Sequence, residues 1–153
     1  MTPQKFHSEL EASFPFTPTT SQNKWFPEIT KFIFSKEKNN AFLLTGYAGT
    51  GKTTLIGSLV SQLKLTDYKA VLMAPTGRAA KVMSTYSKFS ARTIHKQIYY
   101  PKPESGGKMQ FQLKVNKFRK TIFIIDEASM IGDDRQNAKL FENGSLLHDA
   151  VSY

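Results

Sequence analysis

Three short apolar runs, separated by stretches of helical spacing, dominate the pattern of hydrophobic and polar positions along this 153-residue chain. The runs cover residues 41–45, 70–74 and 121–126, and each predicts a β-strand. The third is apolar at every position from Ile122 to Ile125, which is typical of a strand buried on both faces of a parallel sheet. Strands that alternate with helices along a chain indicate an α/β fold.

Helical spacing of apolar residues predicts the remaining elements. A first helix is expected to begin near Thr20 or Ser21, either of which could cap it, and a second helix follows the first strand. Further helices are expected over residues 78–85, 91–99, 135–142 and 145–153, and a strand that could form half of a hairpin over 109–115. Residues 1–18 contain three prolines and no sustained period, so we expect a lead-in segment there and one α/β domain over 19–153.

The loop after the first predicted strand carries a complete G-x-x-x-x-G-K-[ST] motif. Its glycines let the backbone wrap closely around a phosphate chain in conformations that a side chain would forbid. The free N–H groups and the N-terminus of the next helix then face the anion. The motif therefore predicts a bound nucleoside triphosphate, held by Gly46, Tyr47, Ala48, Gly49, Thr50, Gly51, Lys52, Thr53 and Thr54.

Two residues of this loop have further predicted roles. Lys52 can reach the β- and γ-phosphates, and the hydroxyl of Thr53 can hold Mg²⁺. The alternative is a glycine-rich turn that binds nothing, and the context of strand, loop and helix argues against it.

Two carboxylates end the third predicted strand, at the edge where parallel α/β sheets bind their ligands. Asp126 can position the hydrated Mg²⁺, and Glu127 can orient and deprotonate the water that attacks the γ-phosphate. By itself the pair is equally consistent with a helix N-cap and an acidic first turn. Downstream of a complete phosphate loop, the catalytic interpretation is favoured, with Lys52, Asp126 and Glu127 as the catalytic set.

Composition narrows the class of protein. The chain has room for one domain with a real core, and its 40% hydrophobic content is close to that of globular proteins. The lack of cysteine excludes a disulfide framework and a thiolate zinc site. The N-terminus shows no apolar signal core, and no run approaches the length of a membrane span, so we expect a cytoplasmic protein without a membrane partner.

The net charge of +9 comes from one part of the chain. Residues 78–120 contain eleven Lys or Arg residues and a single acid, Glu104. Aromatic residues are interleaved with them: Tyr86, Phe89, Tyr99, Tyr100, Phe111 and Phe118. Basic residues bind phosphates and exposed aromatics stack on unpaired bases, which favours single-stranded nucleic acid. The alternative is a solvated basic face with half of the aromatics in the core.

Taken together, the motifs resemble the RecD-like branch of superfamily 1 DNA helicases. Their order and approximate spacing match across about residues 15–153, and four local matches carry the resemblance: 46–54 (first motif), 74–81 (motif Ia), 91–95 (the Thr-Ile-His element) and 125–130 (motif II, Asp-Glu-Ala-Ser). The resemblance implies a P-loop NTPase fold of the RecA-like kind, with a parallel sheet flanked by helices, and ATP with Mg²⁺ as cofactors.

The resemblance also implies roles for residues that composition alone does not distinguish. Single-stranded DNA would be the partner, contacted by Thr76, Gly77, Arg78, Thr93 and His95. Gln22, ahead of the phosphate loop, is similar to the family glutamine that reads the adenine edge. In isolation, Arg78 and His95 would be taken as ordinary surface residues.

Two parts of the family pattern are not found in these 153 residues. One is a further strand that ends in Gly-Asp with a downstream Gln, and the other is a second RecA-like domain with an arginine that completes the γ-phosphate site. We therefore expect an N-terminal piece of a larger protein, with the sheet incomplete. Three functions remain open: the ATP-binding half of a DNA helicase, a nucleotide- and DNA-binding piece without catalysis, and a P-loop ATPase that does not act on nucleic acid.

Overall fold

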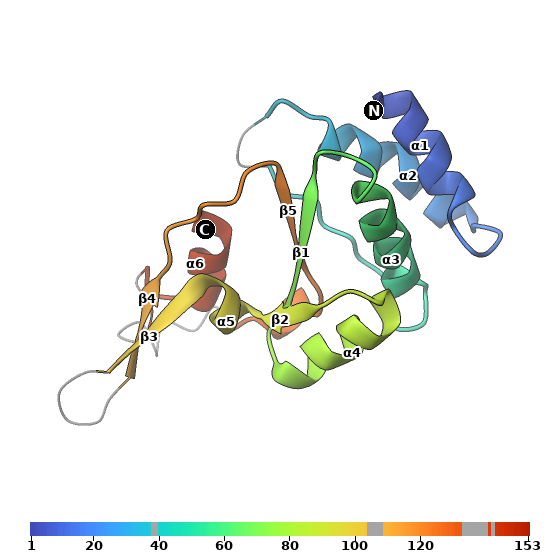
Figure 1. Ribbon diagram of the computed structural model, residues 1–153. Helices are drawn as coiled ribbons and strands as arrows, with labels where there is room; N and C mark the ends of the chain where they lie inside the picture. The colour runs from blue at the N-terminus through green and yellow to red at the C-terminus, as the bar shows by residue number, and fades with distance from the viewer. Residues whose placement is uncertain (38–39, 104–108, 133–140, 142) are drawn as a thin grey trace. The chain divides into compact units, whose positions relative to one another are not determined.

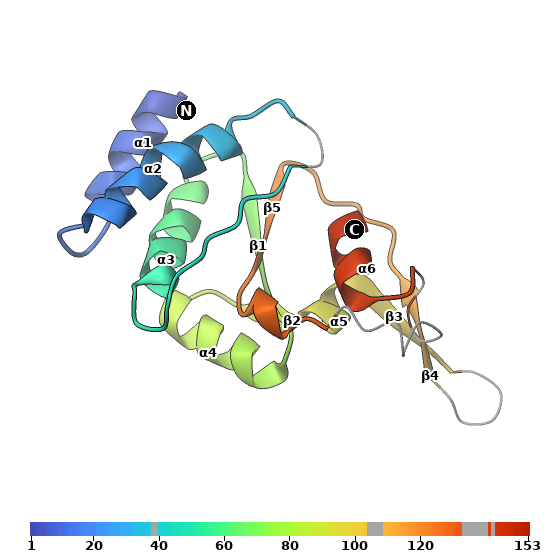
Figure 2. The same cartoon turned by 180° about the vertical axis from the view of Figure 1, so that it is seen from behind.

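The computed structural model describes residues 1–37, 40–103, 109–132, 141 and 143–153, and divides the chain into two compact units. Figures 1 and 2 show the elements from opposite sides. The first unit, Met1–Ala70, contains α1 (Pro3–Ala12), α2 (Thr20–Ile33) and α3 (Lys52–Leu63). The second, Val71–Tyr153, contains the last four residues of β1 (Lys69–Ala74), then α4 (Gly77–Ser87), β2 (Ala91–Thr93), α5 (Ile94–Ile98), β3 (Tyr99–Pro103), β4 (Met109–Leu113), β5 (Thr121–Ile125), the short 3₁₀ helix η1 (Ala128–Met130) and α6 (Leu146–Ser152). Each unit is described by itself.

Helix α1 forms in the segment for which the sequence predicts no regular structure. The Thr2 hydroxyl accepts a hydrogen bond from the Lys5 N–H, and Pro3 occupies the first turn, where it costs no hydrogen bond. Phe6 and Leu10, one turn apart, are fully buried. Helices α2 and α3 both pack on α1, so burial of two large side chains stabilises a helix whose sequence has little periodicity of its own.

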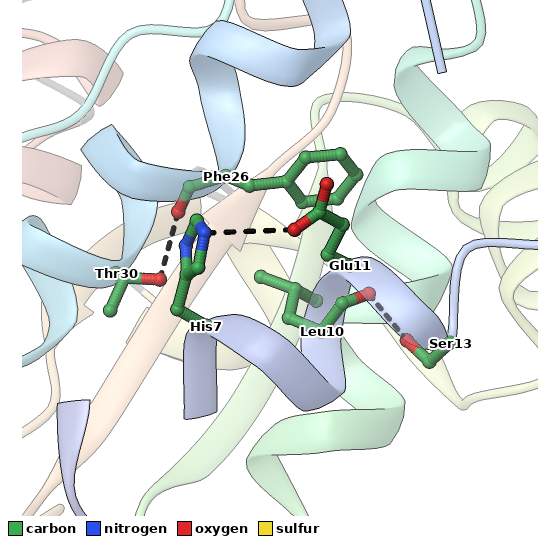
Figure 3. A network of polar contacts seen from close by, with 6 residues as sticks. All are labelled: His7, Leu10, Glu11, Ser13, Phe26 and Thr30. Atoms are coloured by element: carbon green, nitrogen blue, oxygen red, sulfur yellow. Dashed lines mark hydrogen bonds and ion pairs between the residues drawn. The ribbon is translucent and has the colours of Figure 1, made fainter. Parts of the chain in front are cut away.

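Figure 3 shows polar contacts within α1 and within α2, two helices that pack on each other. The Thr30 hydroxyl donates to the Phe26 carbonyl at 2.8 Å, close to Pro27, which has no N–H to give to the helix. On α1, His7 Nε2 lies 3.7 Å from Glu11 Oε2, and the Ser13 hydroxyl donates to the Leu10 carbonyl at the end of the helix.

The strand predicted over residues 41–45 is wrong. This segment has no regular secondary structure, and Leu43 is 80% exposed. Phe42 packs on Phe32 of α2 at 5.6 Å between ring centroids, which is its aromatic anchor in the first unit. An extended segment becomes a strand only when a neighbouring strand pairs with its backbone, and within the described residues neither sheet includes this one.

The second unit is built on a parallel three-stranded sheet in the order β2–β1–β5, which confirms the α/β prediction. Leu72 pairs with Ala91 and Ala74 with Thr93. The Asp126 N–H donates to the Met73 carbonyl at 3.0 Å, just past the end of β5. Helix α4 connects β1 to β2 and packs on β2. The strands predicted over 70–74 and 121–126 are thus confirmed within a residue or two.

The other three predicted helices have different outcomes. The segment 91–99 is not one helix: it divides into β2, the short helix α5 and the start of β3, because its first residues pair with β1. The helix expected over 145–153 is present as α6. The one expected over 135–142 lies outside the described residues except for Phe141.

An antiparallel hairpin follows α5. Tyr99 of β3 pairs with Leu113 of β4, and Pro103 with Met109, which confirms the strand expected over 109–115. Tyr99 is buried in the core of the second unit together with Met73, Ile94, Ile98 and residues from the C-terminal part of the chain.

A buried carboxylate joins this hairpin to α6. Asp149 is fully buried, and one of its oxygens accepts a hydrogen bond from the Tyr99 hydroxyl at 2.5 Å. The other oxygen accepts from the backbone and side-chain N–H groups of Asn143, at 3.0 and 2.6 Å. Three donors therefore compensate for the loss of water around this side chain.

Among the described helices, none combines the length and apolar character needed to cross a membrane.

Replacement of Asp149 by Ala will leave the Tyr99 hydroxyl and the Asn143 amide without their acceptor. We expect the free energy of unfolding to fall by about 1–3 kcal/mol, measured by urea denaturation. Tyr99→Phe, which keeps the ring, will lose less, and Glu28→Ala at an exposed position of α2 is the control. An Asp149→Ala variant as stable as the unmodified chain would show that the hydrogen bonds contribute nothing net.

Candidate nucleotide and nucleic-acid sites

The predicted phosphate loop has the backbone that its glycines permit. Gly49 and Gly51 have φ of +77° and +84°, in the left-handed region that side chains disfavour. Gly51 caps α3, whose first residue is Lys52, so the free N–H groups of that helix begin at the loop. At Gly46, an added Cβ would lie 2.9 Å from the Thr50 hydroxyl, so any side chain there would displace that hydroxyl. These features fit a phosphate group.

The side chain of Lys52 is hydrogen-bonded to the backbone of the loop. Its Nζ donates to the carbonyls of Gly46 and Tyr47, both at 2.8 Å. The Thr50 hydroxyl donates to the same Tyr47 carbonyl at 2.8 Å. An ammonium group has three donors, so two hydrogen bonds to carbonyls leave capacity for an anion. The cation is thereby held on the chain segment that would surround the phosphates.

Gln22 lies against this loop. Its Nε2 donates to the Thr50 carbonyl at 3.0 Å, and a Cβ added at Gly51 would lie 2.8 Å from that nitrogen. The Oε1 atom accepts from the Thr19 N–H at 2.9 Å, which completes a capping box at the start of α2. The structure thus places Gln22 at the loop, where a nucleotide-site residue is expected. Both the oxygen and the nitrogen of its amide are already hydrogen-bonded. Its contact with adenine stays a prediction.

In the second unit, the two acids follow β5 directly. Asp126 is half-buried, and its carboxylate accepts the N–H of Glu127 at 3.0 Å. Glu127 is exposed and has φ +54° and ψ +38°, an uncommon left-handed conformation for a residue other than glycine. Such a conformation costs on the order of 1–3 kcal/mol and is concentrated at functional sites. The turn into η1 directs the two carboxylates differently, so one is sheltered and one reaches solvent.

The sheet brings three predicted motifs to one edge. Thr76 follows the end of β1, Thr93 ends β2, and Asp126 follows the end of β5, which are adjacent strands. Both threonines are helix N-caps: the Thr76 hydroxyl accepts the Ala79 N–H at 3.1 Å, and the Thr93 hydroxyl accepts the Lys96 N–H at 3.2 Å. The carboxyl edge of a parallel sheet is where α/β proteins bind ligands.

Gly77 and Arg78 form the first turn of α4 and are exposed, so both are accessible to a strand. His95 has a different environment. Its ring lies 5.3 Å from the ring of Phe111 and 5.9 Å from those of Tyr99 and Phe141. Burial among these rings lowers the pKa of His95 below its ordinary value of 6.5. The imidazole is therefore neutral near pH 7, and it would meet DNA as a hydrogen-bonding group.

The aromatic residues of the basic segment, residues 78–120, divide between the surface and the core. Tyr86, Tyr100 and Phe118 are exposed, while Tyr99 is buried and Phe111 is half-buried in the aromatic cluster. One lysine of the segment is structural: Lys114 Nζ donates to the carbonyls of the last turn of α5 at 2.7 and 3.2 Å. About half of the aromatics are thus available at the surface.

Sequence reasoning did not find the buried polar group of Asp149, or the particular exposed face that carries Tyr86. Nothing in the local sequence distinguishes Asp149 from a solvated acid. Helical spacing around Met83 could have indicated which face of α4 is exposed.

Comparison with known proteins gives several partial matches. A family model described as an AAA domain matches residues 30–145. The uncharacterized protein MJ1519 of Methanocaldococcus jannaschii is 35% identical over 135 residues, covering 81% of this chain and 11% of that protein. The ATP-dependent DNA helicase dda of Enterobacteria phage T4 is 38% identical over 78 residues, covering 50% and 17%. The ATP-dependent RecD2 DNA helicase of Deinococcus radiodurans is 32% identical over 91 residues, covering 60% and 12%.

The chain spans less than a fifth of the length of each of these relatives. No solved structure matches it.

Titration of His95 will give a pKa below 6.5, followed by NMR of the imidazole protons. Because the unfolded chain binds this proton more readily than the folded chain, the contribution of His95 to stability is complete above about pH 6.5 and falls as the pH drops through the lowered value. Urea unfolding at pH 7.5 and 5.5 measures the loss, and His95→Gln should reduce it. A pKa at or above 6.5 would contradict the burial argument.

Proposed function

We propose that this chain, which belongs to the AAA domain family and is related to superfamily 1 helicases, is the ATP-binding part of a DNA helicase motor. In this proposal ATP hydrolysis drives movement along single-stranded DNA and the unwinding of duplex. The observation that carries it is the phosphate loop, in which Gly49 and Gly51 are left-handed and α3 begins at Lys52.

The loop and its lysine support nucleotide binding. In the proposed complex, Lys52 exchanges the carbonyls of Gly46 and Tyr47 for phosphate oxygens, and residues 46–54 supply backbone N–H groups. Since the lysine already lies on the loop, little side-chain entropy is lost when the anion arrives.

Bound ATP with Mg²⁺ supplies the phosphoanhydride and the metal that neutralises its charge. Thr53 and Asp126 are the proposed metal-holding groups, one at the start of α3 and one after β5. Glu127 is the proposed base that orients the attacking water and takes its proton. The exposed, left-handed position of Glu127 supports this division of roles, since Asp126 is the more sheltered of the two.

The DNA contacts we propose are Thr76, Gly77, Arg78, Thr93 and His95. Support comes from their common edge of the sheet, where α4 and α5 both begin. Arg78 supplies a charge for phosphate, and the N-termini of the two helices direct N–H groups toward the same edge. Gln22 is proposed to read the adenine after it releases one of its two hydrogen bonds.

A second candidate is a chain that binds nucleotide and single-stranded DNA without turnover. It is favoured by the coverage of the two helicases, of which this chain spans 17% and 12%. A P-loop ATPase that does not act on nucleic acid is the third, and a titration with single-stranded DNA distinguishes it from the other two.

Nucleotide binding is tested by titrating the 153-residue chain with a fluorescent ATP analogue and Mg²⁺. We expect saturable binding that Lys52→Ala weakens by at least about tenfold, since charge-assisted hydrogen bonds to the phosphates are lost. Lys24→Ala, at an exposed position of α2, is the matched control and should bind as the unmodified chain does. Equal binding by the Lys52 variant would contradict the proposed phosphate site.

Hydrolysis is tested in the protein that carries this chain, with and without single-stranded DNA. Glu127→Gln should lower the DNA-stimulated rate by about 10²–10⁴-fold while nucleotide affinity is kept, because only the proton acceptor is removed. Glu28→Gln is the control for loss of an exposed acid. Undiminished turnover by the Glu127 variant would refute its role as base.

A further inference from the structure

Helix α4 has an exposed face that the proposed contacts at its N-terminus do not use. Its inward side is formed by Ala80, Met83 and Ser87, which are buried. The residues of the opposite side and of the C-cap are exposed: Arg78, Lys81, Val82, Thr85, Tyr86 and Lys88. Tyr86 is 72% exposed and Val82 is 48% exposed, so two apolar side chains lie in water between cations.

The orientation of this face is fixed by hydrogen bonds on the inward side. The Ser84 hydroxyl donates to the Ala80 carbonyl and accepts the Ala91 N–H of β2, both at 2.8 Å. The Ser87 hydroxyl donates to the Met83 carbonyl at 2.6 Å and accepts the N–H of Phe89. These bonds tie the second half of α4 to the chain that leads into β2, the next element in Figure 1.

The charged residues on the exposed face of α4 are all basic. Helix α4 contains no acidic residue, and within the described residues no ion pair involves Arg78, Lys81 or Lys88. Lys81 lies on the helix, and Lys88 is its C-cap in a left-handed conformation with φ +60°. Arg78, Val82 and Tyr86 follow each other at intervals of four, so they form one row with the charge at the motif end and the ring at the far end.

We infer that this face of α4 binds single-stranded nucleic acid, with Tyr86 stacking on a base and Lys81 and Lys88 contacting phosphates. The inference rests on the proposed function and extends its DNA contacts beyond Arg78 along the helix. A ring that is exposed beside cations suits a ligand that carries both an anionic backbone and open aromatic faces. In duplex the bases are stacked on one another, so the aromatic contact selects the single strand.

The test compares binding of a fluorescent oligonucleotide by the 153-residue chain and its variants. Tyr86→Ala should weaken binding by about 5- to 150-fold, the range for loss of one base stack, while Tyr86→Phe keeps the ring and should bind nearly as the unmodified chain does. Lys81→Gln with Lys88→Gln should weaken binding and reduce the slope of log K against log salt by about 0.7 for each phosphate contact. Phe16→Ala and Lys24→Gln change an exposed aromatic and an exposed lysine elsewhere and should have no effect.

The outcomes separate this inference from the proposed function. If Arg78→Gln weakens binding and the Tyr86 and Lys variants do not, the α4 face is overturned and the proposed DNA contacts stand. If Tyr86→Ala and Tyr86→Phe weaken binding equally, the stacking role is overturned. If duplex of the same sequence competes as well as single strand, selection by stacking is overturned. If the unmodified chain binds no oligonucleotide, the proposed function fails and the inference fails with it.

Discussion

Parallel pairing of β1 with both of its neighbours is the constraint on which the second unit depends. In a parallel sheet the carboxyl ends of the strands meet at one edge, so residues far apart along the chain become neighbours there. The register of β1 with β2 sets Ala74 beside Thr93, and the Asp126 N–H continues the pairing on the other side of β1. Had these strands paired antiparallel, the motif residues would lie at opposite ends of the sheet. The candidate DNA contacts and the acidic pair thus share a single cause.

The phosphate loop depends on a different kind of constraint, which is local. Its conformation needs two residues with positive φ, and glycine supplies them at little cost. With that backbone, the carbonyls of Gly46 and Tyr47 point at the ammonium of Lys52. Gln22 adds a tertiary contact, because it connects the start of α2 to the Thr50 carbonyl. Glu127 shows the opposite case, because it has positive φ without being glycine.

The hairpin of β3 and β4 is held by its contacts with the rest of the second unit. Tyr99 contributes twice, since its ring lies against His95 and Phe111 and its hydroxyl binds Asp149. A two-stranded hairpin alone is only marginally stable in water, so these contacts are what keep it in place. They also explain why His95 is half-buried and why its pKa is lowered.

The sequence by itself determined the family, the α/β class, the glycine-rich loop and the order of the motifs, because each depends on residue types at short spacing. It also predicted β1, β5 and the helices α2 to α4 closely, since their periodicity reports burial on one face. Tertiary structure decided the rest. The apolar run 41–45 is no strand because pairing needs a partner, and α1 forms because Phe6 and Leu10 find a place to be buried. The environments of His95 and Asp149 arise from contacts between residues distant in the chain, which no local pattern encodes.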